Sequence, residues 1–208
     1  MRVLRSRAAT SPAGAGSGPA LESWSAGEAT ILVGVPVHDG VSTADIVVPG
    51  TVLADTLGAS VRLLARNPGT FVGVEPSRTI VVTSRMADVA SPDIVLIPGG
   101  VGWRAQADDQ RHLDWLRVAC RSAMGVLCVS TGSLLLAAAG VLDGEDAAGH
   151  WLAHRQMADL GANPVADRIH YSTNGRIVTA SGALAAGAAA KTLIDRLGYG
   201  PPDAGQNS

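Results

Sequence analysis

Cysteine is scarce in this sequence, and no residues have metal-site spacing. The two cysteines among 208 residues are Cys120 and Cys128. Neither their number nor their spacing resembles a disulfide framework or a zinc site. We therefore expect a reducing compartment, with a cytoplasmic location as the default. The five histidines form no HExxH-type pattern, so no metal site is predicted.

Charge and long hydrophobic runs are also scarce. Charged residues make up 16% of the chain and the formal net charge is -2, which gives no basic surface for nucleic acid. No apolar run approaches the ~20 residues that cross a membrane. Residues 1–29 contain no continuous apolar core of signal-peptide length. We therefore predict no nucleic-acid and no membrane partner.

Apolar residues are plentiful, at 47% of the chain, which is enough for one globular domain. We place this domain at residues 30–198. Residues 1–29 are rich in Ala, Gly, Ser and Pro and are predicted to be a flexible extension, with Leu21 and Trp24 as possible anchors. Residues 199–208 are predicted to be a tail.

The domain alternates apolar runs with helix-like stretches. The runs are typical of strands buried on both faces, and lie at 30–37, 60–66, 93–100 and 125–129. The predicted helices lie at 44–57, 106–122, 131–142, 151–161 and 184–198. Turn residues predict local pairing of two short strands near residues 70–84 and, around Asn174-Gly175, a hairpin over 168–180.

This alternation indicates an α/β fold with a largely parallel sheet that is covered by helices on both faces. Ligand sites in such sheets lie beyond the carboxyl ends of the strands. The loops at 38–43, 98–103 and 130–133 meet this condition. A site is therefore expected where these three loops converge, and its partner is expected to be a small-molecule substrate.

The stretch VLCVSTGS, residues 126–133, indicates a strand that turns sharply into a helix. Cys128 lies inside the apolar run and should be buried, whereas Ser130 is the first residue beyond it. The free N–H groups at the start of the helix favour negative charge beside Ser130. The alternative is that Ser130 only caps the helix, because serine is a preferred N-cap residue.

Four motifs in order resemble the ThiJ/PfpI family, which has the class I glutamine amidotransferase-like fold. They are the segment Asp45-Ile46-Val47-Val48-Pro49, the strand end Ile97-Pro98-Gly99-Gly100, the VSTGS turn, and GHW at 149–151. Each is weak alone, but their order and spacing together are specific. The likeness is strongest to the isonitrile hydratase-like branch and covers residues 31 to about 198.

The resemblance implies a flavodoxin-like three-layer sandwich with a short β-hairpin, a homodimer, and no metal or organic cofactor. The family's nucleophilic cysteine matches Ser130 and its acidic partner matches Asp45. A frequent nearby histidine matches His150. The oxyanion-pocket amides match Gly100 and Thr131, and the neighbouring Gly99 and Gly132 belong to the same turns.

Two tryptophans stand beside the predicted site. Trp103 follows the Pro-Gly-Gly turn and Trp151 follows His150. Both could wall a substrate pocket, although packing in the core is at least as good an explanation.

Serine in place of cysteine changes the chemistry that the resemblance implies. A helix terminus contributes about 0.3–2 kcal/mol, which helps to form a thiolate but cannot form an alkoxide. Ser130 would need a general base to attack, and Asp45 and His150 are the candidates. Alternatively, Asp45 acts as general acid/base while Ser130 donates a hydrogen bond.

The sequence thus favours a cofactor-independent hydratase or lyase, of the hydro-lyase class, or a cyclisation catalyst. A biosynthetic pathway of secondary metabolism is one setting for such an enzyme. The alternative is a non-catalytic ligand sensor related to the domains of AraC-type regulators, although no helix-turn-helix extension follows Leu197. A structural dimer is neither supported nor excluded. The carboxylate at Asp45 favours catalysis, because a sensor does not need it.

Overall fold

The structure of the protein, a computed structural model, describes residues 20–25, 30–75 and 78–199. The strands are β1 (Trp24–Ser25), β2 (Leu32–Pro36), β3 (Ser60–Ala65), β4 (Gly69–Val72), β5 (Thr79–Val82), β6 (Ser84–Arg85), β7 (Ile94–Ile97), β8 (Gly125–Val129), β9 (Asp146–Ala148), β10 (Asn163–Val165), β11 (Ile169–Tyr171) and β12 (Ile177–Ala180). The α-helices are α1 (Thr43–Leu57), α2 (Trp103–Ala107), α3 (Gln110–Ser122), α4 (Gly132–Ala138), α5 (His154–Asp159) and α6 (Ala183–Arg196). Short 3-10 helices lie at η1 (Met86–Asp88) and η2 (Trp151–Ala153). None of the helices in these ranges is long and apolar enough to cross a membrane.

The central sheet confirms the predicted α/β architecture. Within the described residues it has eight strands, seven of them in the order β1-β3-β2-β7-β8-β12-β11, with β6 paired to β3. The pairs from β3 through β2, β7 and β8 to β12 are parallel, and β1 and β11 are antiparallel at the edges. The antiparallel β11–β12 pair is the predicted hairpin, and β4 pairs with β5 as expected.

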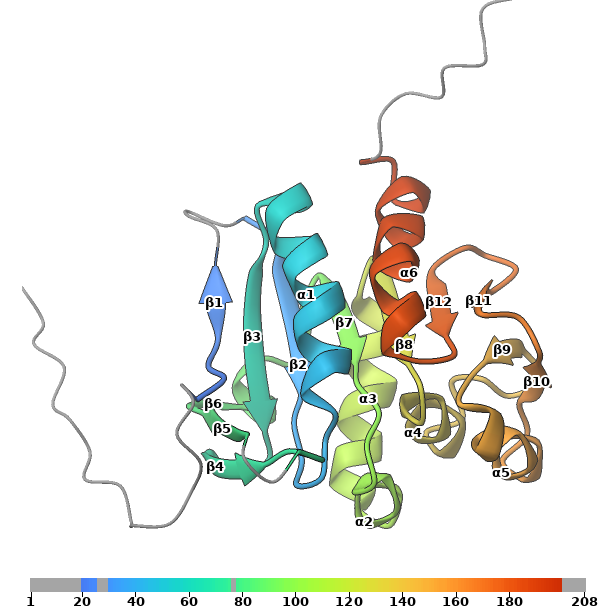
Figure 1. Ribbon diagram of the computed structural model, residues 1–208, viewed down its shortest axis with the longest axis horizontal. Coiled ribbons are helices and arrows are strands. Elements are labelled where there is room, and N and C mark those ends of the chain that lie inside the picture. The colour runs from blue at the N-terminus through green and yellow to red at the C-terminus, as the bar shows by residue number, and fades with distance from the viewer. Residues whose placement is uncertain (1–19, 26–29, 76–77, 200–208) are drawn as a thin grey trace, which may run out of the picture.

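Helices cover both faces of this sheet, so the domain is a three-layer sandwich (Figure 1). Side chains alternate along the buried strands: Leu127 and Val129 of β8 pack with α1 and α6, whereas Val126 and Cys128 pack with α3 and α4. Two apolar cores result, one on each side of the sheet. This arrangement confirms the flavodoxin-like fold.

The predicted helix at 106–122 is divided in the structure. It consists of α2 and α3, separated at Asp108 and Asp109. The carboxylate of Asp109 accepts a hydrogen bond from the Arg111 N–H at 3.1 Å and caps α3. Aspartate is a preferred N-cap residue, so Asp109 could have indicated that a new helix begins here.

The described part of the predicted extension belongs to the sheet. Trp24 and Ser25 form β1 and pair with Val61 and Ser60 of β3. The indole ring of Trp24 covers Gly50 of α1, where a Cβ atom would lie 2.8 Å from the ring. Trp24 and Ser25 therefore extend the edge of the central sheet, and Leu21 pairs with Ile80 of β5. The remainder of the predicted extension, 1–19 and 26–29, lies outside the described residues, as does the predicted tail from 200 onward.

Two histidines are buried, His38 in the loop after β2 and His112 on α3. His38 and His112 are each only 2% exposed, and the Nε2 atom of each has no hydrogen-bond partner among the described groups. The Nδ1 atom of His38 donates to the Asp39 carbonyl at 2.9 Å, which leaves Nε2 unprotonated in the neutral ring. Burial lowers the pKa of His38 and lowers that of His112 to about 4.

We expect acid to destabilise the fold through His112. Below the ordinary histidine pKa of about 6.5 the unfolded chain binds a proton that the folded chain does not bind until about pH 4. The free energy of unfolding should therefore fall with pH across this window, by up to about 3 kcal/mol for this histidine. Urea denaturation of a His112→Leu variant should show a flatter pH dependence than the wild type. His154→Leu on α5 serves as the control, and an unchanged slope in His112→Leu would contradict the assignment.

Candidate active site

The site forms where the loops after β2, β7 and β8 meet, as the strand order predicts. Hydrogen bonds join the loops: Ser42 N–H donates to the Gly99 carbonyl at 2.8 Å, Gly100 N–H donates to Thr131 Oγ1 at 2.8 Å, and Thr131 Oγ1 donates to the Gly100 carbonyl at 3.1 Å. A Cβ atom on Gly100 would collide with the backbone of Val41, and its φ of +143° also favours glycine. The three loops are therefore held in one rigid cluster.

Ser130 occupies the turn between β8 and α4, as the sequence predicts. Its φ is +59°, and it is the one non-glycine residue with positive φ in the part of the chain that the structure describes. Its N–H donates to the Ala180 carbonyl at 2.8 Å, and its carbonyl accepts from Ser133 Oγ at 2.8 Å and from His150 N–H at 3.3 Å. These bonds hold a conformation that a serine seldom adopts, which is a feature of functional turns.

Neither native cysteine lies at this turn. Cys128 is fully buried within β8, as predicted, and burial raises its pKa. Burial likewise raises the pKa of Cys120 to about 12. Both thiols are therefore protonated at neutral pH and packed in the core, so neither is a candidate nucleophile.

Asp45 is placed in the site by the first turn of α1. Ser42 caps this helix by accepting a hydrogen bond from the Asp45 N–H at 3.3 Å. Asp45 is 3% exposed and lines the cavity of the site, and its carboxylate accepts a hydrogen bond from Gly99 N–H at 3.1 Å. Burial raises the Asp45 pKa, although the contacts with Gly99 and Ser42 partly oppose that shift. The carboxyl group therefore keeps its proton to a higher pH than an exposed aspartate.

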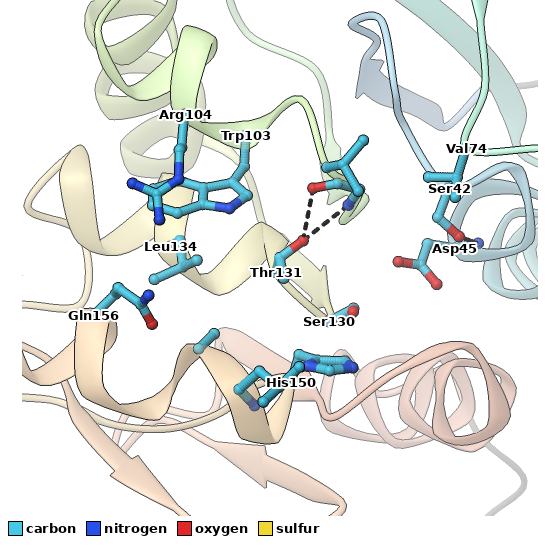
Figure 2. Close-up of a pocket in the computed structure, with 14 residues that line it drawn as sticks. Ser42, Asp45, Val74, Trp103, Arg104, Ser130, Thr131, Leu134, His150 and Gln156 are labelled. Carbon is cyan, nitrogen blue, oxygen red and sulfur yellow. Dashed lines mark hydrogen bonds between the residues drawn. The ribbon is translucent and has the colours of Figure 1, made fainter.

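Gly99 permits Asp45 and Ser130 to approach one another. A Cβ atom on Gly99 would lie 2.9 Å from Asp45 Oδ2 and 2.9 Å from Ser130 Cβ, so these two atoms are at most twice that distance apart. No direct hydrogen bond joins the two side chains, and the Ser130 hydroxyl has no partner among the described residues. Figure 2 shows both side chains at the same cavity, with His150 beside Ser130. A small reactant or a water molecule can therefore contact Asp45 and Ser130 together.

The predicted oxyanion amides are only partly available. Gly100 N–H is engaged by Thr131 Oγ1, and Gly99 N–H is engaged by Asp45, so neither is an open donor in this structure. The Thr131 N–H has no acceptor among the described groups. Gly132 packs against the Ile97 carbonyl, where a Cβ atom would be 2.6 Å away, and its contribution is close packing. The Gly132 N–H likewise has no acceptor among the described groups, so the open backbone donors of the expected set are those of Thr131 and Gly132.

His150 and Trp103 lie at the cavity that contains Asp45 and Ser130, whereas Trp151 lies outside it. The His150 Nδ1 atom accepts a hydrogen bond from Leu152 N–H at 3.3 Å, so the neutral ring carries its proton on Nε2. Trp103 lines the cavity shared by Asp45 and Ser130. Trp151 does not: it is 72% exposed and borders a separate cavity of about 420 Å³ beside Leu184. The η2 turn leaves Trp151 outside the cavity shared by Asp45 and Ser130, and its predicted contact with a substrate stays a prediction.

The cavity at the site has a volume of about 440 Å³ and is predominantly apolar, which suits a small organic molecule. Its wall also contains residues that the sequence did not point to: Ser42, Val74, Val101, Arg104, Leu134, Leu152, Ala153 and Gln156. Ser42 had a usable signal, since a serine three residues before an acidic residue often caps a helix. Among the described residues no group of three or more His, Cys, Asp or Glu side chains is placed to hold a metal ion.

Comparison with known proteins agrees with this geometry. The model of the DJ-1/PfpI family matches residues 31–196. An isonitrile hydratase from Pseudomonas putida is 33% identical over 169 residues, covering 80% of this chain and 72% of that protein. The similarity to an enzyme of this family supports enzymatic activity.

Solved structures show the same fold. A ThiJ/PfpI family protein from Pseudomonas syringae superposes with a TM-score of 0.73 at 23% identity, covering 85% of this chain and 79% of that one. A ThiJ/PfpI domain protein from Brachyspira murdochii gives 0.72 at 17% identity, covering 84% and 100%. At these identities the likeness concerns the fold alone.

Proposed function

Because the chain belongs to the DJ-1/PfpI family, we propose that it is a cofactor-independent hydratase that adds water to an isonitrile and forms an N-substituted formamide. The observation that carries this proposal is the buried Asp45 carboxyl group, which shares the cavity with the Ser130 hydroxyl, a group that has no partner among the described residues. A relative that is an isonitrile hydratase supports the choice of substrate class.

The proposed reaction begins with a proton transfer from Asp45. Its raised pKa enlarges the fraction of acid form at neutral pH, and this acid protonates the terminal isonitrile carbon. A water molecule then attacks that carbon, a C–O bond forms, and the proton released by the water returns to the Asp45 carboxylate. The product of this step is an imidic acid, which becomes the formamide when its O–H proton moves to nitrogen. One water is consumed, and no electrons are transferred to or from another reagent.

The remaining groups bind and orient the reactants. The free Ser130 hydroxyl accepts a hydrogen bond from the attacking water, and the Thr131 N–H donates to the oxygen as it becomes bound to carbon. The His150 Nε2–H is available for the final transfer from oxygen to nitrogen. A non-covalent function for Ser130 is supported by its hydroxyl, which forms no hydrogen bond with Asp45 or His150, the two groups that could activate it as a nucleophile.

A ligand-sensing domain is the second candidate. Two observations favour it: a serine stands at the turn between β8 and α4, and the Gly100 amide is already hydrogen-bonded. Both weaken a covalent mechanism of catalysis. The burial of Asp45 argues against it, because an ionisable group is costly to bury and a sensor gains no proton transfer from it.

Hydration of alkyl and aryl isonitriles by the purified protein tests the proposal. We expect loss of the isonitrile infrared band and stoichiometric appearance of the formamide by NMR, with its oxygen derived from isotopically labelled water. If every isonitrile is left unchanged while small ligands still raise the melting temperature, the sensor is the better description.

A further inference from the structure

The active-site cavity has a second polar end that the proposed reaction does not use. Figure 2 shows Asp45 on one side of Ser130 and Thr131, and Arg104 with Gln156 on the other. All five residues line the same cavity, and the apolar side chains of Trp103 and Leu134 lie at the Arg104 end. A molecule whose reacting group meets Asp45 would therefore extend toward Arg104.

Among the residues that the structure describes, Arg104 has no anionic partner. Its guanidinium carbon lies 4.8 Å from the centroid of the Trp103 ring, which holds the side chain over that ring. Asp108 and Asp159 border an adjoining cavity together with Arg104, but neither forms an ion pair with it. The guanidinium donors therefore remain available to a ligand.

Gln156 presents a second unsatisfied group at the same end. Its Oε1 atom is buried and accepts no hydrogen bond from any described group. A buried carbonyl oxygen without a donor is uncommon, because its lost hydration is not compensated. A ligand that carries an N–H or O–H group would satisfy it.

We propose that Arg104 and Gln156 form a subsite for a carboxylate at the end of the substrate opposite its reacting group. Gln156 accepts a hydrogen bond from an N–H or O–H group beside that carboxylate, and Trp103 and Leu134 contact the apolar segment between the two ends. The evidence for the subsite is this geometry alone. Only the identity of the reacting group depends on the proposed isonitrile hydration.

A carboxylate fits this end better than a more highly charged anion. A single guanidinium matches the two oxygens of one carboxylate as a planar fork. Arg104 is the one lysine or arginine that lines the cavity among the described residues, and Asp45 at the other end would oppose a dianion. The site thus selects a singly charged tail on an otherwise apolar molecule.

A binding experiment tests the subsite without requiring turnover. The probes are formamidoalkanoates of increasing chain length and their methyl esters, titrated by calorimetry into wild type, Arg104→Gln and Arg155→Gln. Arg155 is the matched control, since it is an exposed arginine next to Gln156 and does not line the cavity. We expect the acid to bind roughly tenfold more tightly than its ester to wild type, which corresponds to about 1.4 kcal/mol.

This preference should disappear in Arg104→Gln, persist in Arg155→Gln, and weaken with added salt because Arg104 is exposed. An α-hydroxy group on the acid should strengthen binding to wild type but not to Gln156→Met. Equal affinity of acid and ester for wild type, or a preference that survives in Arg104→Gln, would overturn the proposal. Melting temperatures of all variants control for folding.

Turnover separates this inference from the proposed reaction. With isocyanoalkanoates, Arg104→Gln should raise KM roughly tenfold and leave kcat nearly unchanged, because the lost contact is the same in substrate and transition state. If no isonitrile reacts but the Arg104-dependent preference for acids is present, the subsite stands and the hydration proposal is wrong. If acids and esters are hydrated with equal KM, the hydration proposal stands and the subsite is wrong.

Discussion

Replacing Asp45 by asparagine is expected to lower kcat/KM for hydration by ~10²–10⁴-fold, the range for removal of a general acid/base. Asparagine retains the shape and can still accept the hydrogen bond from Gly99 N–H, so the cavity should persist. Ser130→Ala removes one hydrogen-bonding group and should cost only ~10-fold, or about 1.4 kcal/mol. The exposed Asp55, also on α1, provides a control in Asp55→Asn.

The same Asp45 substitution should stabilise the fold at neutral pH. Because the folded pKa of Asp45 is raised, the unfolded chain ionises first as pH rises above about 3.9, and the wild type loses stability until the folded carboxyl also ionises. The asparagine side chain of the variant does not ionise, so the advantage of the variant should be absent at low pH and grow across that window. Chemical denaturation measures it. Near-wild-type activity in Asp45→Asn would instead exclude Asp45 as the acid and favour the sensor.

Introducing a thiol at the turn should create the reactive cysteine that the protein otherwise lacks. In Ser130→Cys, the new thiol faces the cavity, whereas Cys128 is buried and the pKa of Cys120 is about 12. A thiol of ordinary pKa, about 8.5, has ~10³-fold more thiolate at neutral pH than one of pKa 12. We therefore expect alkylation by iodoacetamide at position 130 to be at least ~10³-fold faster than at Cys120.

Peptide mass spectrometry locates the alkylated position in this experiment. Ser133→Cys is the matched control, because Ser133 is buried one turn further along and a thiol there should react slowly. Equal rates in the two variants, or first modification of Cys128, would show that position 130 is not the open position of the turn.

The positions of the strand ends and loops that form this site were mostly predictable from local sequence patterns. The apolar run that ends at Val129, followed by small residues, placed Ser130 beyond the strand and Cys128 inside it, and the structure agrees. Such runs report burial directly, because a central parallel strand has apolar neighbours on both faces. The same rule brought the three loops together at the carboxyl ends of β2, β7 and β8.

Other features depended on contacts between segments that lie far apart in the chain. Trp24 pairs with β3, which no local pattern around Trp24 could indicate, since a composition rich in Ala, Gly and Ser is compatible with a flexible segment or an edge strand. The division of α2 from α3 at Asp109 was in principle predictable, because the apolar positions that indicated this helix, Leu113, Leu116 and Cys120, all lie in α3.

By itself, then, the sequence determined the alternation of strands and helices and the position of Ser130 beyond its strand, because burial period and turn residues are local properties. The approach of Asp45 to Ser130 was implied by the family resemblance. Tertiary structure alone decided which donors are free. The Thr131 hydroxyl engages the Gly100 amide of a neighbouring loop, the η2 turn directs Trp151 outward, and Arg104 and Gln156 meet at one cavity from α2 and α5. These three features depend on how far apart the helices and loops lie and how they are oriented. A side-chain hydrogen bond forms only within a narrow range of distances and angles, so a small shift of one element would break it.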